Sequence, residues 1–499
     1  MAALLRSRFV GGSILKVADL NPLVLKAEYA VRGQILQRAM EIEADIKAGN
    51  AKWPFDRVVR CNIGNPQALG QTPPKFARQV LSMIMNPELL ATGVSSYSTE
   101  VLERARTYAT AIKGGVGAYS DSKGVRIVRD EVAAFIEQRD GYPSDPEAIY
   151  LTDGASAGVR HLTQLLLRGP QDAILAPSPQ YPLYSALATL GNGSIAPYYL
   201  DEEADWSVAV DELERAYAAA AKAGNIPRGL VIINPGNPTG ASLTREALDG
   251  IVHFCQRRDL VLLADEVYQE NVYGTAPPFV SLKKVMRDLR ADDVPLVSFH
   301  SISKGFTGEC GLRGGYFELA NFRTDVRAQL TKLASISLCS NVVGQIGVGL
   351  MVNPPTSPEE KSAYEADRDA KLDSLERRAE LVADALNALP GVSCARAQGA
   401  LYLFPNIEVP PKAVDAAAAA GLQPDAFYSL RMLESTGLVV VPGSGFGQKN
   451  GTWHFRTTFL PSPDDIESVV ARLAGFHRGF LEEFADPAEP AHPSPSSDL

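Results

Sequence analysis

The sequence predicts an α/β fold in which helices enclose a mostly parallel central sheet, followed by a smaller α+β domain. Short apolar runs alternate with stretches whose apolar residues recur at helical spacing. The runs are almost continuously apolar, as strands buried on both faces of a parallel sheet are. A proline-rich break at 352–367 then separates this alternating part from the rest of the chain.

The expected strands share a β-rich, apolar composition and lie at 148–152, 172–177, 229–234, 260–265 and 295–300. Between them, 155–169 and 244–259 are predicted helices. A long charged helix is expected to follow the break and to end near Ala388, before the proline and glycine of 389–392. Thr356 with Glu359, or Ser357 with Glu360, resembles a capping box at its start. The alanine-rich stretch 414–423 is expected to form a surface helix or insertion.

These patterns divide the chain into five predicted parts. They are a flexible amino terminus (1–18), an amino-terminal arm with part of the small domain (19–89), a large domain (90–350), a small carboxy-terminal domain (351–484) and a disordered tail rich in proline and serine (485–499).

Composition excludes several functional classes. The chain has 499 residues, 45% of them hydrophobic and 21% charged, which is typical of a soluble globular protein. A net charge of −10 argues against a general nucleic-acid surface, and no run of about 18 apolar residues predicts a membrane span. The five cysteines are scattered and form no CxxC pair, and no HExxH occurs, so neither a disulfide framework nor a metal site is expected.

The first 18 residues carry Arg6, Arg8 and Lys16 and no acid. This composition is shared by mitochondrial transit peptides and by unstructured amino termini. We prefer the second interpretation, which predicts a cytoplasmic protein, and keep a mitochondrial location as the alternative.

Polar or aromatic groups follow each expected strand, at the edge where open α/β sheets bind their ligands. In chain order these are Ala155 and Ser156 at the start of a helix, Tyr181, Asn237, Asp265 with Tyr268, and Lys304. A helix amino terminus offers free backbone N–H groups to a phosphate, so the first pair is a candidate anion site. Each signal alone has an ordinary structural explanation, such as a helix cap, a turn or a surface charge, but their joint order favours a ligand site.

The stretch 298–315 combines glycine, serine and lysine, as phosphate-binding loops do. The P-loop pattern GxxxxGK[ST] is absent, however, and Lys304 precedes Gly305 instead of following a glycine run. A chemical role for Lys304 therefore has to be considered.

Six stretches resemble those of pyridoxal-phosphate-dependent aminotransferases of fold type I, and within them the alanine aminotransferase branch. They are CNIGNPQALGQ (61–71), GAYSDSKG (117–124), INPGNPTG (233–240), ADEVYQENVY (264–273), SFHSISKGFTGECGLRGGY (298–316) and FRTTFLP (455–461). The similarity extends from about Asp19 to Phe484.

The resemblance implies that Lys304 forms the Schiff base with pyridoxal 5′-phosphate. It further implies that Ser301 and Arg313 bind the phosphate, together with Ala155 and Ser156. Tyr119 resembles a tyrosine that reaches the phosphate of the neighbouring subunit, which implies a homodimer with shared active sites.

Other residues take roles around the ring and the substrate by the same resemblance. Asp265 is expected to face the pyridine nitrogen, Tyr268 and Asn237 the 3′-oxygen, and Tyr181 the ring face. Arg456 is expected to bind the substrate α-carboxylate, with the backbone of Gly64 beside it. The glycine-rich turn at 439–447 is expected to support the wall that carries Arg456.

The implied function is ping-pong transamination between L-alanine and 2-oxoglutarate, giving pyruvate and L-glutamate. The alternatives are a glutamate:glyoxylate aminotransferase of the same branch and a pyridoxal-phosphate-dependent lyase of the same fold. A non-enzymatic regulator of this fold is disfavoured, because both Lys304 and Asp265 are present. The expected partners are small amino acids and 2-oxo acids, with no nucleic acid and no membrane.

Overall fold

The computed structural model describes residues 16–29, 33–50, 52–274 and 276–485. The predicted amino-terminal segment, with Arg6 and Arg8, lies outside these ranges except for its last three residues. The predicted tail lies outside them except for Ala485.

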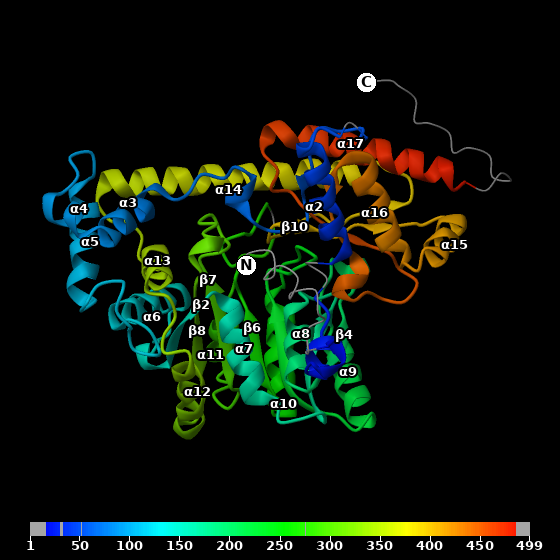
Figure 1. The fold of residues 1–499 in the computed structure, drawn as a ribbon. Helices are drawn as coiled ribbons and strands as arrows, with labels where there is room; N and C mark the ends of the chain where they lie inside the picture. The colour runs from blue at the N-terminus through cyan, green and yellow to red at the C-terminus, as the bar shows by residue number, and fades with distance from the viewer. Residues whose placement is uncertain (1–15, 30–32, 51, 275, 486–499) are drawn as a thin grey trace, which may run out of the picture.

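A seven-stranded sheet forms the centre of the protein (Figure 1), with the order β2-β8-β7-β6-β5-β3-β4. These strands are β2 (Ile149–Asp153), β3 (Asp172–Ser178), β4 (Ser194–Tyr199), β5 (Ile226–Ile233), β6 (Val261–Asp265), β7 (Leu296–Ser301) and β8 (Gly314–Ala320). All neighbours pair in parallel except β8, which is antiparallel to both β2 and β7. The predicted fold class is confirmed, and each of the five predicted strands is present within three residues of its expected bounds.

Alternate residues of each central strand enter two different cores, which explains the nearly continuous apolar runs. In β3, Ala173 and Leu175 pack with the helices at 210–222 and 245–258, whereas Ile174 and Ala176 pack with those at 155–166 and 183–190. The helices around the sheet are α6 (Arg126–Asp140), α7 (Ala155–Leu166), α8 (Leu183–Leu190), α9 (Val210–Lys222), α10 (Arg245–Arg258), α11 (Leu282–Asp288), α12 (Thr324–Ile336) and α13 (Val342–Val352). Three further helices are α3 (Lys75–Met85), α4 (Pro87–Thr92) and α5 (Thr99–Ala111). Helix α3 packs against α13, and α4 and α5 pack against α3.

Helix α14 (Pro358–Asn387) runs across the top of the molecule in Figure 1, from α3–α5 to the carboxy-terminal region. The proposed capping box is wrong: Ser357 is the N-cap, but its hydroxyl donates to Glu100 Oε2 at 2.5 Å and makes no capping bond within the helix. Glu100 on α5 also accepts a hydrogen bond from the Ser357 N–H. The hydroxyl and the N–H of Ser357, which a capping box would use, are therefore both bonded to Glu100.

The carboxy-terminal region combines small helices and short strands around its own core. Its elements are β9 (Val392–Ser393), β10 (Tyr402–Leu403), β11 (Asn406–Ile407), α15 (Pro411–Ala419), α16 (Pro424–Thr436), β12 (Leu438–Val439), β13 (Val441–Pro442), β14 (Phe455–Thr458) and α17 (Pro463–Glu483). Helix α15 starts three residues before the predicted stretch and ends before Gly421, which has a φ of +69°.

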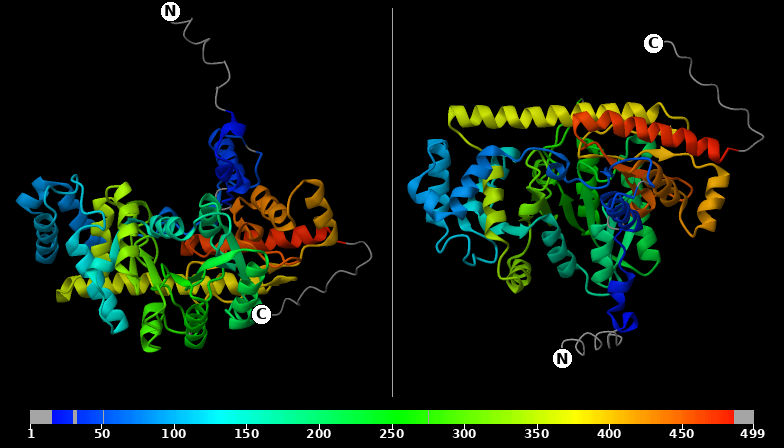
Figure 2. Two further views of the ribbon diagram at one scale, coloured as in Figure 1. Left: turned by 90° about the horizontal axis from the view of Figure 1, so that it is seen from below. Right: turned by 45° about the horizontal axis from the view of Figure 1, so that its top comes forward.

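The amino-terminal segment contributes to the carboxy-terminal region. Helix α2 (Gln34–Lys47) packs on α16, and β1 (Val59–Arg60) pairs in parallel with β12. Helix α1 (Pro22–Lys26) lies against α8 and stands out at the surface in Figure 2. No helix in the part of the chain that the structure describes has the length and apolar character needed to cross a membrane.

Candidate active site

One cavity of about 850 Å³ lies between the carboxyl ends of the parallel strands and the carboxy-terminal region. It is lined by all the predicted site residues except Tyr119: Gly64, Ala155, Ser156, Tyr181, Asn237, Asp265, Tyr268, Ser301, Lys304, Arg313 and Arg456. The strand-end pattern predicted seven of these residues, and the resemblance added Gly64, Ser301, Arg313 and Arg456. The fold brings both sets to the same cavity.

One end of the cavity is suited to an anion. Helix α7 begins there after Gly154, which has a φ of +76°, and presents the N–H groups of its first turn. Arg313 lies across this turn and donates from Nη2 to Asp153 O at 2.9 Å and to Ser156 Oγ at 3.3 Å. The positive φ of Gly154 favours glycine, and a Cβ at this position would displace the Arg313 guanidinium from the turn. Ser301, buried at the end of β7, lines the same cavity.

Lys304 follows β7 and extends into the cavity, where its Nζ donates to Gly64 O at 2.8 Å. The backbone of Gly64 comes close to this amine and to the hydroxyl of Tyr402. A Cβ at position 64 would collide with that hydroxyl and lie 3.1 Å from Lys304 Nζ. Glycine at this position therefore keeps the space around the amine open.

Asp265 ends β6 and is 6% exposed. Its Oδ2 accepts a hydrogen bond of 2.7 Å from the hydroxyl of Tyr184, whereas its Oδ1 is buried without a partner among the described residues. Burial raises the pKa of Asp265 to about 6, and the hydrogen bond from Tyr184 and the charge of Lys304 oppose that rise. The unpaired oxygen therefore calls for a donor from a ligand.

Arg456, on β14, is 1% exposed and also lacks a full set of partners. Its Nη1 donates to Asn237 Oδ1 at 3.0 Å, its Nη2 donates to Asn62 O, and its Nε has no partner among the described residues. No carboxylate within those residues forms an ion pair with it. A buried guanidinium without a counter-ion is suited to a carboxylate ligand.

The predicted support for Arg456 comes from the 439–447 turn, because Val441 of β13 is the register partner of Arg456 in β14. The ring of Tyr402, on β10, adds a second support, with the guanidinium carbon 4.2 Å from its centroid. The Tyr402 hydroxyl in turn accepts a hydrogen bond of 3.1 Å from Tyr268. Tyr402 thus connects Tyr268 with Arg456.

Tyr181 lines the cavity next to Tyr29, and their hydroxyl groups lie 2.7 Å apart. Sequence reasoning missed Tyr29, Tyr184 and Tyr402. Tyr184 lies in an apolar helical stretch and Tyr402 on a two-residue strand, so neither carried a signal that separates it from a core aromatic residue.

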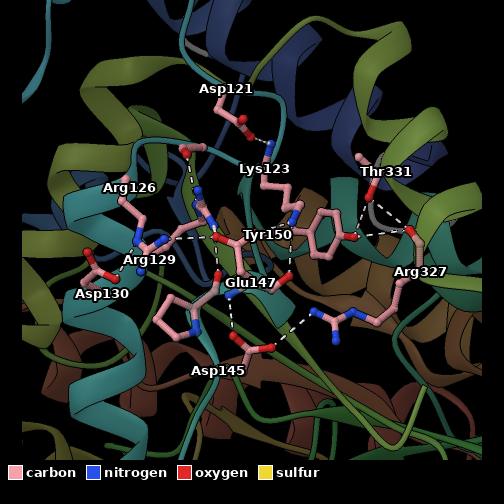
Figure 3. Close-up of polar contacts among 12 residues, drawn as sticks. Asp121, Lys123, Arg126, Arg129, Asp130, Asp145, Glu147, Tyr150, Arg327 and Thr331 are labelled. Atoms are coloured by element: carbon pink, nitrogen blue, oxygen red, sulfur yellow. Dashed lines mark hydrogen bonds and ion pairs between the residues drawn. The ribbon is translucent and has the colours of Figure 1, made fainter. Parts of the chain in front are cut away.

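Tyr119 lies outside the cavity of its own chain and is 79% exposed. The loop that carries it is nevertheless fixed: Lys123 O accepts from the N–H of Leu151 at 2.8 Å, and Lys123 Nζ pairs with Glu147 at 2.6 Å. Figure 3 shows Lys123 together with Arg126 and Arg129 around Glu147. Hydrogen bonds from Lys123 and Arg129 lower the pKa of Glu147 to about 2. This network fixes the loop at Lys123, four residues after the exposed phenol of Tyr119.

Residues 87–473 match the family described as aminotransferase class I and II. The chain belongs to this family. It is 51% identical over 472 residues to alanine aminotransferase 2, mitochondrial, of Arabidopsis thaliana, an alignment that covers 93% of this chain and 87% of that protein. It is 46% identical over 480 residues to glutamate–glyoxylate aminotransferase 2 of the same plant, with 95% and 98% covered. The solved structure of alanine aminotransferase from Pyrococcus furiosus superimposes with a TM-score of 0.73 at 25% identity, covering 92% of this chain and 100% of that one.

Class I and II aminotransferases use pyridoxal phosphate, and the cavity of this aminotransferase fits that group. The α7 amino terminus and Arg313 supply donors for a phosphate. The unpaired Asp265 Oδ1 supplies an acceptor for a protonated ring nitrogen. Lys304 Nζ lies in the same cavity, as covalent attachment to an aldehyde requires.

Proposed function

We propose that this aminotransferase moves the amino group of L-alanine to 2-oxoglutarate by a ping-pong mechanism, giving pyruvate and L-glutamate. The proposal rests on two buried charged side chains, Asp265 and Arg456, that line one cavity with Lys304. Each has one polar atom without a hydrogen-bond partner among the described residues. The choice of alanine rests on the 51% identity to the Arabidopsis relative named for that substrate.

Arg456 binds the α-carboxylate of the incoming amino acid, because its buried guanidinium already holds a fixed orientation. Asn237 Oδ1 and Asn62 O occupy some of its N–H groups, and Tyr402 packs against its face. The unpartnered Nε adds a donor for the substrate. Because Arg456 is buried, a carboxylate bound to it would be shielded from water.

Lys304 is the residue that holds the cofactor and later moves the proton. The chemistry that bound pyridoxal phosphate supplies is electron withdrawal from the substrate α-carbon. As a free amine, Lys304 Nζ would take the proton from that carbon, acting from the cavity wall formed by β7 and Gly64. Ionised Asp265 would pair with the ring nitrogen, and Asn237 and Tyr268 would bind the ring oxygen.

A panel of amino donors and oxo acids tests this function. Full-length protein loaded with pyridoxal phosphate is expected to release one pyruvate per active site from L-alanine alone. It is expected to form pyruvate repeatedly only when 2-oxoglutarate or another oxo acid accepts the amino group. Faster transfer from L-glutamate to glyoxylate would favour the second candidate, which the 46% identity to a relative named for that reaction supports. Release of more than one product molecule per active site from an amino acid without any acceptor would indicate a lyase and overturn the proposal.

We also infer a homodimer in which Tyr119 reaches the phosphate end of the partner's cavity. The exposed phenol, the ordered loop behind it and the exposed side chains of Ile336 and Leu338 support an interface here. The Cys339 Sγ accepts a hydrogen bond from Ser120 N, which brings Leu338 beside the Tyr119 loop.

Co-expression of Tyr119→Ala with Lys304→Ala tests the shared site. A mixed dimer is expected to contain one intact site, built from the lysine of one chain and the tyrosine of the other, so activity returns when the variants are combined. If Tyr119 served its own chain, the mixed dimer would have no intact site and activity would stay at the level of the separate variants.

The cellular location is proposed as cytoplasmic, with a mitochondrial location as the alternative that the name of the Arabidopsis relative supports. Residues 1–18 fused to a fluorescent protein decide between them. Diffuse fluorescence is expected for the cytoplasmic location, and accumulation in mitochondria would establish the alternative.

A further inference from the structure

Tyr184, on α8, is buried beneath the cavity and does not line it. Its hydroxyl donates to Asp265 Oδ2 at 2.7 Å and is the only side-chain donor to this carboxylate among the described residues. The two oxygens of Asp265 therefore differ: Oδ2 is held by the protein, and Oδ1 is free.

The hydrogen bond has two physical consequences for the carboxylate. It fixes the rotation of the carboxyl plane, since one oxygen is held by a helix and the carboxylate is attached to the end of a strand. It also stabilises the charged form, which burial disfavours. The other titratable groups that face Asp265 are Lys304, after β7, and Tyr268, in the loop after β6. Lys304 cannot replace the phenol, because its Nζ is directed to Gly64 O.

We propose that Tyr184 is a positioning residue for the cofactor: its phenol holds one oxygen of Asp265 and keeps the carboxylate ionised, so that the other oxygen can pair with the protonated ring nitrogen of pyridoxal phosphate. This inference rests on the cofactor of the proposed function but not on alanine as the substrate. A neutral Asp265 could not stabilise a protonated ring nitrogen, so Tyr184 acts on the ring through Asp265.

The test is a titration of full-length protein, freed of its cofactor, with two probes. One is pyridoxal phosphate, and the other is its 1-deaza analogue, in which a carbon replaces the ring nitrogen. The Tyr184→Phe variant keeps the ring and its packing and removes only the donor. It is expected to bind pyridoxal phosphate about tenfold more weakly than the unaltered protein, the scale of a hydrogen bond to a charged group. Its affinity for the deaza analogue is expected to stay unchanged, because that probe has no ring nitrogen to pair.

Tyr198→Phe is the matched control. Tyr198 is also a fully buried tyrosine, and its hydroxyl donates to the backbone oxygen of Val231 at 2.8 Å and not to a carboxylate. It is expected to bind both probes like the unaltered protein. Equal weakening of both probes by Tyr184→Phe, or no weakening of either, would overturn the proposal.

Two further measurements separate positioning from a general structural effect. In an Asp265→Asn background, Tyr184→Phe is expected to cause no additional loss of pyridoxal-phosphate affinity, since it acts through the carboxylate; an additive loss would contradict the proposal. On acidification, Tyr184→Phe is expected to lose the cofactor at a higher pH than the unaltered protein, and an unchanged midpoint would likewise contradict it. Neither readout requires turnover of alanine, so a different amino donor leaves this result interpretable.

Discussion

Asp265 and Arg456 carry opposite charges and are both buried in the wall of one cavity. They differ in the parts of the chain that supply their contacts. Asp265 ends a central strand, and its partner Tyr184 comes from a helix that packs on the same sheet. Arg456 depends on a backbone carbonyl of Asn62, the side chain of Asn237 and the ring of Tyr402. Those three partners come from widely separated parts of the chain.

Because of this difference, we expect substitutions at the two ends of the site to have different effects. Strand ends of one parallel sheet hold the cofactor end, because their hydrogen-bonded register fixes the relative positions of Asp265 and Ser301. The substrate end forms where the sheet region and the carboxy-terminal region meet. We therefore expect changes at the cofactor end to alter cofactor retention and the chemical step, and changes at the substrate end to alter substrate affinity.

Substitution of Lys304 by alanine removes the one group that serves both ends, and the largest effect is expected there. Turnover should fall by about 10⁴-fold or more, because both the covalent attachment and the proton transfer are lost. The absorbance of the lysine-bound cofactor should disappear, while the melting temperature stays close to that of the unaltered protein. Lys332→Ala, on the surface of α12, is the control and should change neither quantity. Normal turnover by Lys304→Ala would exclude the proposed mechanism.

Asp265→Asn tests the cofactor end. The amide is nearly the size of the carboxylate and can still accept from Tyr184, so the fold should persist while the charge is lost. Turnover is expected to fall by about 10²–10³-fold, the scale of a lost electrostatic contribution in a buried site. The test is to measure kcat, KM and cofactor affinity of the same variant. A rise in KM with unchanged kcat would place Asp265 at the substrate end instead.

Arg456→Ala tests the substrate end. Its KM for L-alanine is expected to rise by about 100-fold, since a charge-assisted pair with the α-carboxylate is lost, and cofactor affinity should change much less. Arg456→Lys keeps the charge but not the planar fork, so it should recover only part of the affinity. Loss of cofactor with little change in KM would contradict the contrast between the two ends.

The same contrast explains which residues the sequence could reveal. Asn237, Asp265 and Lys304 lie at or within four residues of the ends of apolar strands, so the alternation of runs was enough to place them at one edge of the sheet. Tyr402 gains its place through the pairing of β10 with β14, which are separated by more than fifty residues, and no local period signals such a register. Tyr184 lies on the buried face of an ordinary apolar helix, and only the three-dimensional approach to Asp265 distinguishes it from a core tyrosine.

The smallest expected effect concerns the network behind Tyr119, outside both ends of the cavity. Glu147→Gln should lower the free energy of unfolding at neutral pH by about 1 kcal/mol or less, because the carboxylate is half-exposed and its ion pairs are screened. The pKa of Glu147 is lowered to about 2 in the folded protein, so its contribution is complete above the ordinary pKa of a glutamate and is lost as the pH falls through about 2. Thermal unfolding at several pH values should therefore show a difference from the unaltered protein that is largest near neutrality and shrinks below pH ~4.3. Glu137→Gln, on the same helix as Arg126 and Arg129 and without an ion pair among the described residues, should show no such dependence. A difference that grew on acidification would mean that the charge of Glu147 opposes folding.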